Sequence, residues 1–181
     1  MDHLYEKTIK TTEVYKGKII NLEIQEVELP NGKTGSREIV KHPGAVAVVP
    51  VTKEGNIVLV KQFRKALNKT IVEIPAGKLE IGEDPLQSAM RELEEETGYK
   101  TENLEFLLSF YTSPGFADEL IYLYFTDDLQ AGMTNMDDDE FLDVLEVSLE
   151  EAERMIKDQT IHDAKTAYAI NYLRMKESLQ S

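Results

Sequence analysis

The sequence contains no cysteine among its 181 residues, and it is short of histidine, of basic residues and of long apolar runs. Without cysteine the protein forms no disulfide, no thiol nucleophile and no Cys-ligated zinc site. This absence fits a reducing compartment, so we expect a cytoplasmic protein. The three histidines, His3, His42 and His162, are scattered along the chain, and none is assigned a catalytic role.

Acidic residues outnumber basic ones by 34 to 20, which gives a formal charge of −14 at pH 7. DNA, RNA and anionic membranes are bound through clustered Lys and Arg, so this balance argues against all three as partners. An anionic substrate would instead need metal ions and a few well-placed arginines. The longest apolar run, Ala45–Val51, is far too short to cross a bilayer, and the polar segment Met1–Lys10 shows no secretory signal.

Residues 1–43 have the pattern of a small antiparallel sheet, with strand-like segments around Glu13–Tyr15, Ile19–Leu29 and Ile39–Val40. Such a small sheet buries few large apolar side chains, so it should pack on the following domain or on another subunit. We therefore divide the chain into an N-terminal β-sheet region, 1–43, which is a candidate for dimerisation, and a second domain, 44–181.

Residues 44–181 mix strand-like and helix-like patterns. Two apolar segments, Ala45–Val51 and Ile57–Phe63, are joined by Lys53-Glu54-Gly55-Asn56, a turn typical of a β-hairpin. Further strands are predicted at 71–74, 104–111, 120–125 and 144–147, and helices at 85–97, 148–157 and 162–175. β structure followed by mixed strands and helices predicts an α/β layered domain with an N-terminal sheet attached.

The segment Gly77–Tyr99 contains a helix with clear boundaries. Asp84 is a favourable N-cap residue, Pro85 fits the first helical position, and Gln87 completes a capping-box pattern. Gly98 is placed to end the helix. One face carries an apolar stripe at helical spacing, made of Leu86, Ala89, Met90 and Leu93.

Three glutamates flank this stripe. Glu92, Glu95 and Glu96 share one helix face, because positions three or four apart are neighbours at about 3.6 residues per turn. Each pair of like charges costs about 0.2–0.5 kcal/mol on an exposed helix. A hard divalent cation among these oxygens reverses that cost, since Mg²⁺ takes carboxylate ligands and leaves its other positions to water and phosphate. An ordinary glutamate-rich surface helix is the alternative.

The complete motif resembles a known family signature. Gly77, five residues, Glu83, seven residues and then Arg91-Glu92-Leu93-Glu94-Glu95-Glu96-Thr97-Gly98-Tyr99 resemble the Nudix box of the Nudix hydrolases. Only Tyr99 departs from the pattern, because the family usually has an aliphatic residue there. The resemblance implies an α/β (α+β) fold, with a mixed β-sheet sandwiched between helices, and cleavage of nucleoside diphosphate derivatives with Mg²⁺ or Mn²⁺.

Other segments resemble the ADP-ribose pyrophosphatase branch of that family. Pro114, fifteen residues after Tyr99, is similar to the position that is diagnostic of the branch. The remaining similar segments are Arg37-Glu38-Ile39-Val40, His42-Pro43-Gly44-Ala45, Gln62-Phe63-Arg64, Pro75-Ala76-Gly77, and Ser113-Pro114-Gly115-Phe116 with Glu119. Together these segments imply hydrolysis of ADP-ribose to AMP and ribose 5-phosphate.

The resemblance assigns roles residue by residue. The implied metal ligands are Glu92, Glu96, Glu140 and the backbone carbonyl of Ala76. The implied catalytic residues are Glu140 or Asp138 as general base, with Glu95 as a ligand or orienting group. The implied substrate-binding residues are Arg37, Arg64, Lys78, Ser113, Pro114, Gly115 and Glu119. A solvated acidic loop is the alternative for residues 137–140.

The arginines need separate consideration. Arg64 follows an apolar strand, and the simpler interpretation is a surface arginine in an ion pair. The resemblance instead favours a contact between Arg64 and a substrate phosphate, as it does for Arg37. Arg91 is interpreted as structural, because it lies four residues before Glu95 and can hold that carboxylate in place.

Two other functions stay open: hydrolysis of another nucleoside diphosphate sugar or a dinucleoside polyphosphate, and a catalytically silent module that binds ADP-ribose or another nucleotide. The resemblance also implies a homodimer formed through the N-terminal region, in which Arg37 would complete the partner's site.

Overall fold

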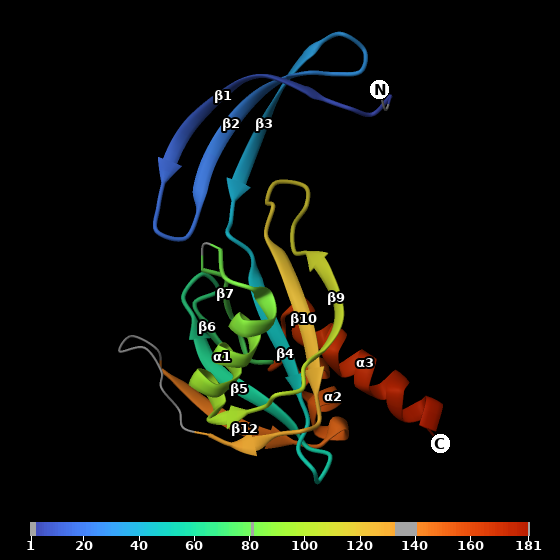
Figure 1. Cartoon of the computed structure of the whole chain (residues 1–181). Coiled ribbons are helices and arrows are strands. Elements are labelled where there is room, and N and C mark those ends of the chain that lie inside the picture. Colours follow the sequence, from blue (N-terminus) through green and yellow to red (C-terminus); the bar gives the residue numbers. More distant parts are fainter. Residues whose placement is uncertain (1–2, 81, 133–140, 181) are drawn as a thin grey trace. The chain divides into compact units, whose positions relative to one another are not determined.

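The computed structural model describes residues 3–80, 82–132 and 141–180. Its strands are β1 (Lys7–Lys16), β2 (Asn21–Glu28), β3 (Thr34–Lys41), β4 (Ala45–Pro50), β5 (Ile57–Arg64), β6 (Lys69–Glu73), β7 (Ala76–Lys78), β8 (Tyr99–Lys100), β9 (Glu105–Tyr111), β10 (Leu120–Thr126), β11 (Gln130–Ala131) and β12 (Leu142–Val147) (Figure 1). Its helices are α1 (Pro85–Thr97), α2 (Leu149–Lys157) and α3 (Ala164–Gln180). None of the helices in the described ranges is long and apolar enough to cross a membrane.

The chain forms two compact units. The first contains the residues up to Gly44 together with Ser109–Ile121, and the second contains Ala45–Leu108 together with the chain from Tyr122 onwards. The segment between β9 and β10 therefore groups with the N-terminal strands.

The first unit is built on the predicted antiparallel sheet, with strand order β1-β2-β3. The turn between β2 and β3 contains Gly32 at a φ of 79°, a backbone conformation that glycine adopts without steric cost. Strand β1 is exposed along its whole length, and its apolar side chains Ile9, Val14 and Tyr15 are each more than half exposed. Apolar side chains of this sheet thus stay exposed, which agrees with the expectation that so small a sheet buries few of them.

The second unit contains the sheets β7-β4-β10-β9 and β12-β5-β6. The predicted hairpin of β4 with β5 is wrong: across the turn the two segments share only the isolated bridge between Val51 and Ile57. Strand β4 and the first half of β5 are buried, and each strand has neighbours on both edges: β4 lies between β7 and β10, and β5 lies between β12 and β6. The two strands therefore diverge into separate sheets.

Helix α1 has the predicted boundaries. Asp84 accepts hydrogen bonds from the backbone N–H groups of Leu86 and Gln87, and Gly98 ends the helix in the left-handed conformation with its N–H bonded to the carbonyl of Glu94. The buried side chains of Ala89 and Leu93 pack in a core with Val46, Val48, Val58, Tyr124 and Leu129. This packing fixes which face of α1 carries the glutamates.

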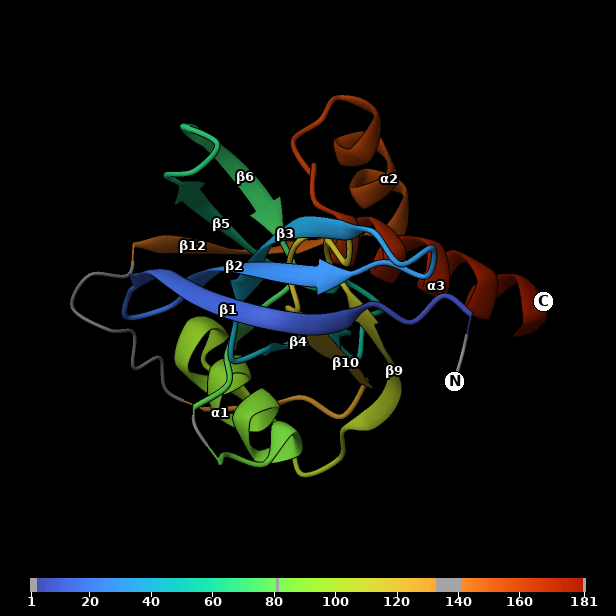
Figure 2. The same ribbon diagram turned by 90° about the horizontal axis from the view of Figure 1, so that it is seen from above.

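The C-terminal helices α2 and α3 contact each other and lie side by side in both views (Figures 1 and 2). Thr166, in the first turn of α3, is fully buried, and its Oγ1 accepts a hydrogen bond of 3.0 Å from the backbone N–H of Ile74. This bond ties α3 to the segment that leads into β7.

Candidate functional site

The strand β7 holds one of the predicted metal ligands. The backbone N–H of Ala76 donates a hydrogen bond of 3.0 Å to Oε2 of Glu96, whose side chain is buried. Strand β7 is itself fixed by antiparallel pairing with β4, in which Ala76 lies opposite Ala47. The Glu96 carboxylate thus has a defined position beside the predicted carbonyl ligand.

Gly77, the next residue, lies against a second predicted ligand. A Cβ atom at this position would lie 1.8 Å from Cδ of Glu92 and 2.1 Å from each of its carboxylate oxygens. The Glu92 carboxylate therefore occupies the space that a side chain at position 77 would fill. The glycine of the motif is required here by this close approach.

Arg91 connects the remaining carboxylates. Its Nη1 donates to Glu92 Oε1 at 2.9 Å and to Glu95 Oε2 at 2.8 Å, which confirms the predicted contact with Glu95. Its Nε and Nη2 donate to the two oxygens of Glu83, at 3.0 and 3.1 Å. The bidentate pair with Glu83 was not expected from the sequence, because Glu83 precedes the helix.

These contacts change the acidity of Glu83. Hydrogen bonds from Arg91 lower the pKa of the Glu83 carboxyl from 4.5 to about 2. The surrounding carboxylates, Glu83 first, raise the pKa of the Arg91 guanidinium. Both groups are therefore charged at neutral pH.

A pH dependence of stability follows from Glu83. Because its pKa is lower in the folded than in the unfolded protein, its contribution is fully present above about pH 4.5 and is lost as the pH falls towards about 2. In metal-free buffer we expect the free energy of unfolding of Glu83→Gln to lie below that of the wild type at pH 7, and the gap to narrow below pH 4.5. Urea titrations at pH 7, 5 and 3.5 measure this gap. Glu13→Gln, on exposed β1, is the control, and a gap that does not change with pH would contradict the assignment.

The donor set suits a hard divalent cation. Three carboxylates and a backbone carbonyl provide only oxygen ligands, and the contact at Gly77 leaves no side chain between Glu92 and β7. Within the described ranges, no three His, Asp or Glu side chains form a ready metal-binding group. In this structure Glu92 and Glu95 are bonded to Arg91, and Glu96 is bonded to the N–H of Ala76. We therefore keep Glu92, Glu96 and Ala76 as the predicted ligands.

Arg64, the last residue of β5, is ion-paired. Its Nε donates to Oε2 of Glu73 at 2.5 Å, while 39% of its side chain remains exposed. This geometry fits both interpretations, the structural ion pair and the contact with phosphate. The ion pair engages Nε of Arg64, whereas a phosphate can be bound by a fork of two other guanidinium N–H groups. Lys78, the other predicted substrate-binding residue of this unit, ends β7 and is exposed.

The first unit holds the other predicted substrate-binding residues. Arg37 on β3 is ion-paired with Glu6, which raises the pKa of its guanidinium. The loop Ser113–Glu119 runs beside the end of β3, where the N–H of Val40 donates to the carbonyl of Phe116 at 2.7 Å. Arg37 precedes Val40 by three residues, about 10 Å of strand.

Glu119, at the end of this loop, is fixed by neighbours of its own unit. Its Oε2 accepts a bond of 2.6 Å from the hydroxyl of Thr112, and its Oε1 lies 3.7 Å from Nε2 of His42. Asp118 beside it accepts from the N–H of His42 at 2.8 Å and pairs with Lys41. Asp138 and Glu140, the predicted general bases, lie outside the described residues.

Sequence reasoning missed Glu73. This carboxylate is 3% exposed as a residue and lies in the otherwise apolar run Ile71-Val72-Glu73-Ile74. A charged residue inside a buried strand is the signal that could have identified it, since buried charges are normally paired. Its partners, Arg64 and Lys165, come from β5 and α3.

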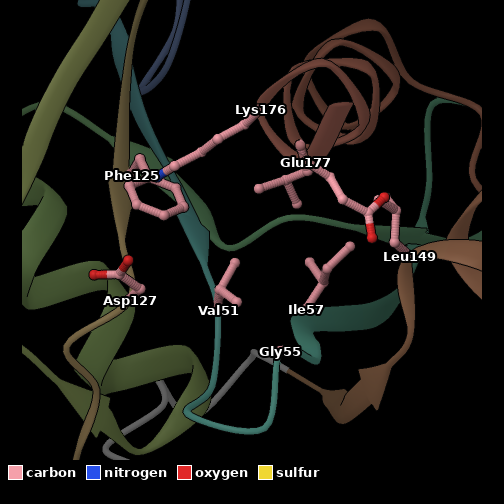
Figure 3. Close-up of a pocket in the computed structure, with 9 residues that line it drawn as sticks. Val51, Gly55, Ile57, Phe125, Asp127, Leu149, Lys176 and Glu177 are labelled. Atoms are coloured by element: carbon pink, nitrogen blue, oxygen red, sulfur yellow. The ribbon is translucent and has the colours of Figure 1, made fainter. Parts of the chain in front are cut away.

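A separate pocket lies beside α3 (Figure 3). Its lining combines apolar residues, Val51, Ile57, Phe125, Leu149 and Leu173, with the charged residues Asp127, Lys176 and Glu177. The ammonium group of Lys176 lies 3.5 Å from the centre of the Phe125 ring, a cation–π contact. This pocket contains none of the predicted site residues.

The chain matches known protein families and individual proteins over most of its length. Two family models match, a NUDIX domain over residues 41–169 and a nucleoside diphosphate sugar hydrolase N-terminal domain over residues 6–40. The chain is 55% identical over 183 residues to an ADP-ribose pyrophosphatase of Bacillus subtilis (strain 168), covering 100% of this chain and 99% of that protein. It is also 55% identical over 177 residues to a methanol dehydrogenase activator of Bacillus methanolicus, covering 97% and 96%.

The fold has a solved counterpart. A crystal structure of an ADP compounds hydrolase matches with a TM-score of 0.85 and 20% sequence identity, covering 97% of this chain and 96% of that one. The predicted α+β fold of mixed sheets and helices is confirmed by this likeness. The NUDIX model spans well over half of the chain and contains the motif Gly77–Tyr99. The chain therefore belongs to the Nudix hydrolase family.

Proposed function

We propose that this protein hydrolyses the pyrophosphate bond of ADP-ribose to give AMP and ribose 5-phosphate. The observation that carries the proposal is the position of Glu92 and Glu96 against Ala76–Gly77, with Glu95 joined to Glu92 through Arg91. The substrate is supported by the full-length similarity to an ADP-ribose pyrophosphatase.

The reaction needs negative charge neutralised on two phosphates, a water in line with the bond that breaks, and a base that takes its proton. Mg²⁺, for which Mn²⁺ could substitute, supplies positive charge next to the diphosphate and acidifies water when bound. Glu92, Glu96 and the Ala76 carbonyl would hold the cation. Glu95 would orient these groups, and Glu140 or Asp138 would accept the proton, with Glu140 as a further ligand.

The arginines would bind the diphosphate. Arg64 on β5, whose Nε donates to Glu73, would offer its two terminal amino groups to a phosphate. Arg37 on β3 donates to Glu6 through Nε and Nη2 and to the Ser36 carbonyl through Nη1, so it would bind phosphate by exchanging these partners. Lys78 would add a further positive charge. The Ser113–Gly115 loop and Glu119 would contact the ribose side of the substrate. Each of these contacts orients the diphosphate before the bond breaks.

A substrate panel tests the proposal. Purified protein is incubated with Mg²⁺ and ADP-ribose, another nucleoside diphosphate sugar, or a dinucleoside polyphosphate, and the products are identified. We expect AMP and ribose 5-phosphate from ADP-ribose, and none after chelation of divalent ions. Faster turnover of another compound would show that ADP-ribose is not the preferred substrate. Tight binding of ADP-ribose without hydrolysis would identify a catalytically silent binding module.

The N-terminal region, 1–43, would form a homodimer, and the protein would act in the cytoplasm. The exposed apolar side chains of β1 and β2, including Ile9, Val14 and Ile24, support the first statement, because a second subunit could bury them. Light scattering should give twice the mass of the 20.6 kDa chain. A monomeric mass would count against the dimer.

Activation of a methanol dehydrogenase is a second candidate function. It is favoured by the 55% identity to the activator of Bacillus methanolicus, which equals the identity to the pyrophosphatase. Adding the protein to a purified methanol dehydrogenase and following the rate of alcohol oxidation tests it. An unchanged rate would remove this candidate.

A further inference from the structure

A buried carboxylate lies between two cations next to the proposed phosphate-binding arginine. Glu73 ends β6, and only 4% of its side chain is exposed. Its Oε2 accepts the hydrogen bond from Nε of Arg64, and its Oε1 accepts one from Nζ of Lys165. Each oxygen of the carboxylate therefore has its own cationic donor, as a buried charge requires.

Lys165 is itself held in place. Only 11% of its side chain is exposed, and its Nζ also donates to Oδ1 of Asp163 at 3.0 Å. The same oxygen accepts from the N–H of Thr166 at 3.1 Å, which caps the start of α3. With two cations and two anions the cluster of Arg64, Glu73, Asp163 and Lys165 has no net charge. The first turn of α3 thus fixes the position of the Lys165 ammonium.

We propose that Lys165 is a positioning residue for Arg64, acting through Glu73. By binding Oε1, Lys165 keeps the Glu73 carboxylate in the orientation that engages Arg64 through Nε. This leaves the two terminal amino groups of the guanidinium, Nη1 and Nη2, for a fork of hydrogen bonds to a substrate phosphate. The inference rests on the proposed function, in which Arg64 binds the diphosphate.

Removal of Lys165 changes the partners of Glu73. The whole charge of this buried carboxylate then acts on Arg64 alone, and the carboxylate is free to rotate and take two guanidinium N–H groups instead of one. Glu73 would then compete with the phosphate for the same donors. The consequence is weaker substrate binding, while the metal-binding carboxylates on α1 are not touched.

Steady-state kinetics with ADP-ribose test the inference. Lys165→Met should raise KM about tenfold, which corresponds to one charge-assisted hydrogen bond to substrate, and should change kcat by less than about twofold. Lys165→Arg restores a cation at the same place and should return KM to within about threefold of the wild type. Thermal unfolding of each variant verifies the fold. If Lys165→Met does not fold, Lys165→Leu, which also lacks a donor, is judged by the same criteria.

Two further variants separate this effect from others. Lys61→Met removes an exposed lysine on β5, the strand of Arg64. If Lys165 acts through Glu73 and not by general attraction of the anionic substrate, Lys61→Met should leave KM unchanged. Arg64→Gln should raise KM by itself. In that background Lys165→Met should have no further effect on KM, because the two residues act through one contact.

The outcomes distinguish the inference from the function on which it rests. If Arg64→Gln leaves KM unchanged, the phosphate role of Arg64 is wrong and the role of Lys165 is lost with it. If Arg64→Gln raises KM but Lys165→Met does not, only the positioning role is overturned. It is likewise overturned if Lys165→Met lowers kcat instead, or if its effect on KM persists in the Arg64→Gln background.

Discussion

Glu96→Gln should lower kcat for ADP-ribose hydrolysis on the order of 10³-fold while leaving the fold intact. Glu96 is 4% exposed and bonded to the N–H of Ala76, and a glutamine oxygen can still accept that hydrogen bond. The substitution removes the negative charge, on which the binding of a divalent cation depends, and replaces one ligand oxygen by an amino group, so several kcal/mol of charge stabilisation are lost with the cation. The rate at saturating Mg²⁺ and the urea midpoint measure the two halves of this prediction.

Glu94→Gln is the matched control, because it makes the same chemical change on the same helix at a residue outside the proposed ligand set. Its activity should stay within about twofold of the wild type. Calorimetric titration with Mg²⁺ adds a direct measurement of metal affinity, which should fall for Glu96→Gln alone. Activity at the wild-type level in Glu96→Gln would refute the metal assignment.

Gly77→Ala should abolish most of the activity at a small cost in stability. The new Cβ would lie 1.8 Å from Cδ of Glu92, so the carboxylate must leave its place. Because it is the end of a flexible side chain, we expect the free energy of unfolding to fall by only about 1 kcal/mol. A displaced ligand lowers metal affinity at least as much as loss of an outer-shell partner, about 10- to 100-fold.

The measurement is the Mg²⁺ concentration that gives half-maximal rate, together with the unfolding midpoint. Gly55→Ala is a suitable control, since its Cβ would meet no atom within 4 Å and its φ of 85° makes the substitution cost stability away from Glu92. Equal losses of activity in both variants would show that the effect of Gly77→Ala is not specific to Glu92. Unchanged Mg²⁺ dependence would contradict the proposed ligand.

Local chemistry explains what the sequence could predict. The boundaries of α1 are determined by Asp84, Pro85 and Gly98 within a single segment, and the glutamate face follows from helical period alone. The resemblance of Gly77–Tyr99 to the Nudix box likewise depends on residues within one stretch of chain. Such features need no knowledge of distant partners.

The errors and omissions concern distant partners. The turn after β4 looked like a hairpin because both flanking strands are apolar, but the choice of neighbouring strand depends on residues far away, such as Leu142–Val147 for β5. The pairing of Glu73 with Lys165 joins positions 92 residues apart, and nothing in either neighbourhood specifies the other. The roles of Asp138 and Glu140 stay predictions.

The hydrogen bond between Thr166 and Ile74 has a consequence for the order of events during synthesis. The strand that carries Ala76 leaves the ribosome well before α3, so the N–H of Ile74 has no Thr166 acceptor until 92 further residues have been made. Contacts between residues so distant in sequence also form late in folding, because closing a long loop costs entropy. The nascent chain should therefore acquire this support for the segment leading into β7 only after α3 has been made.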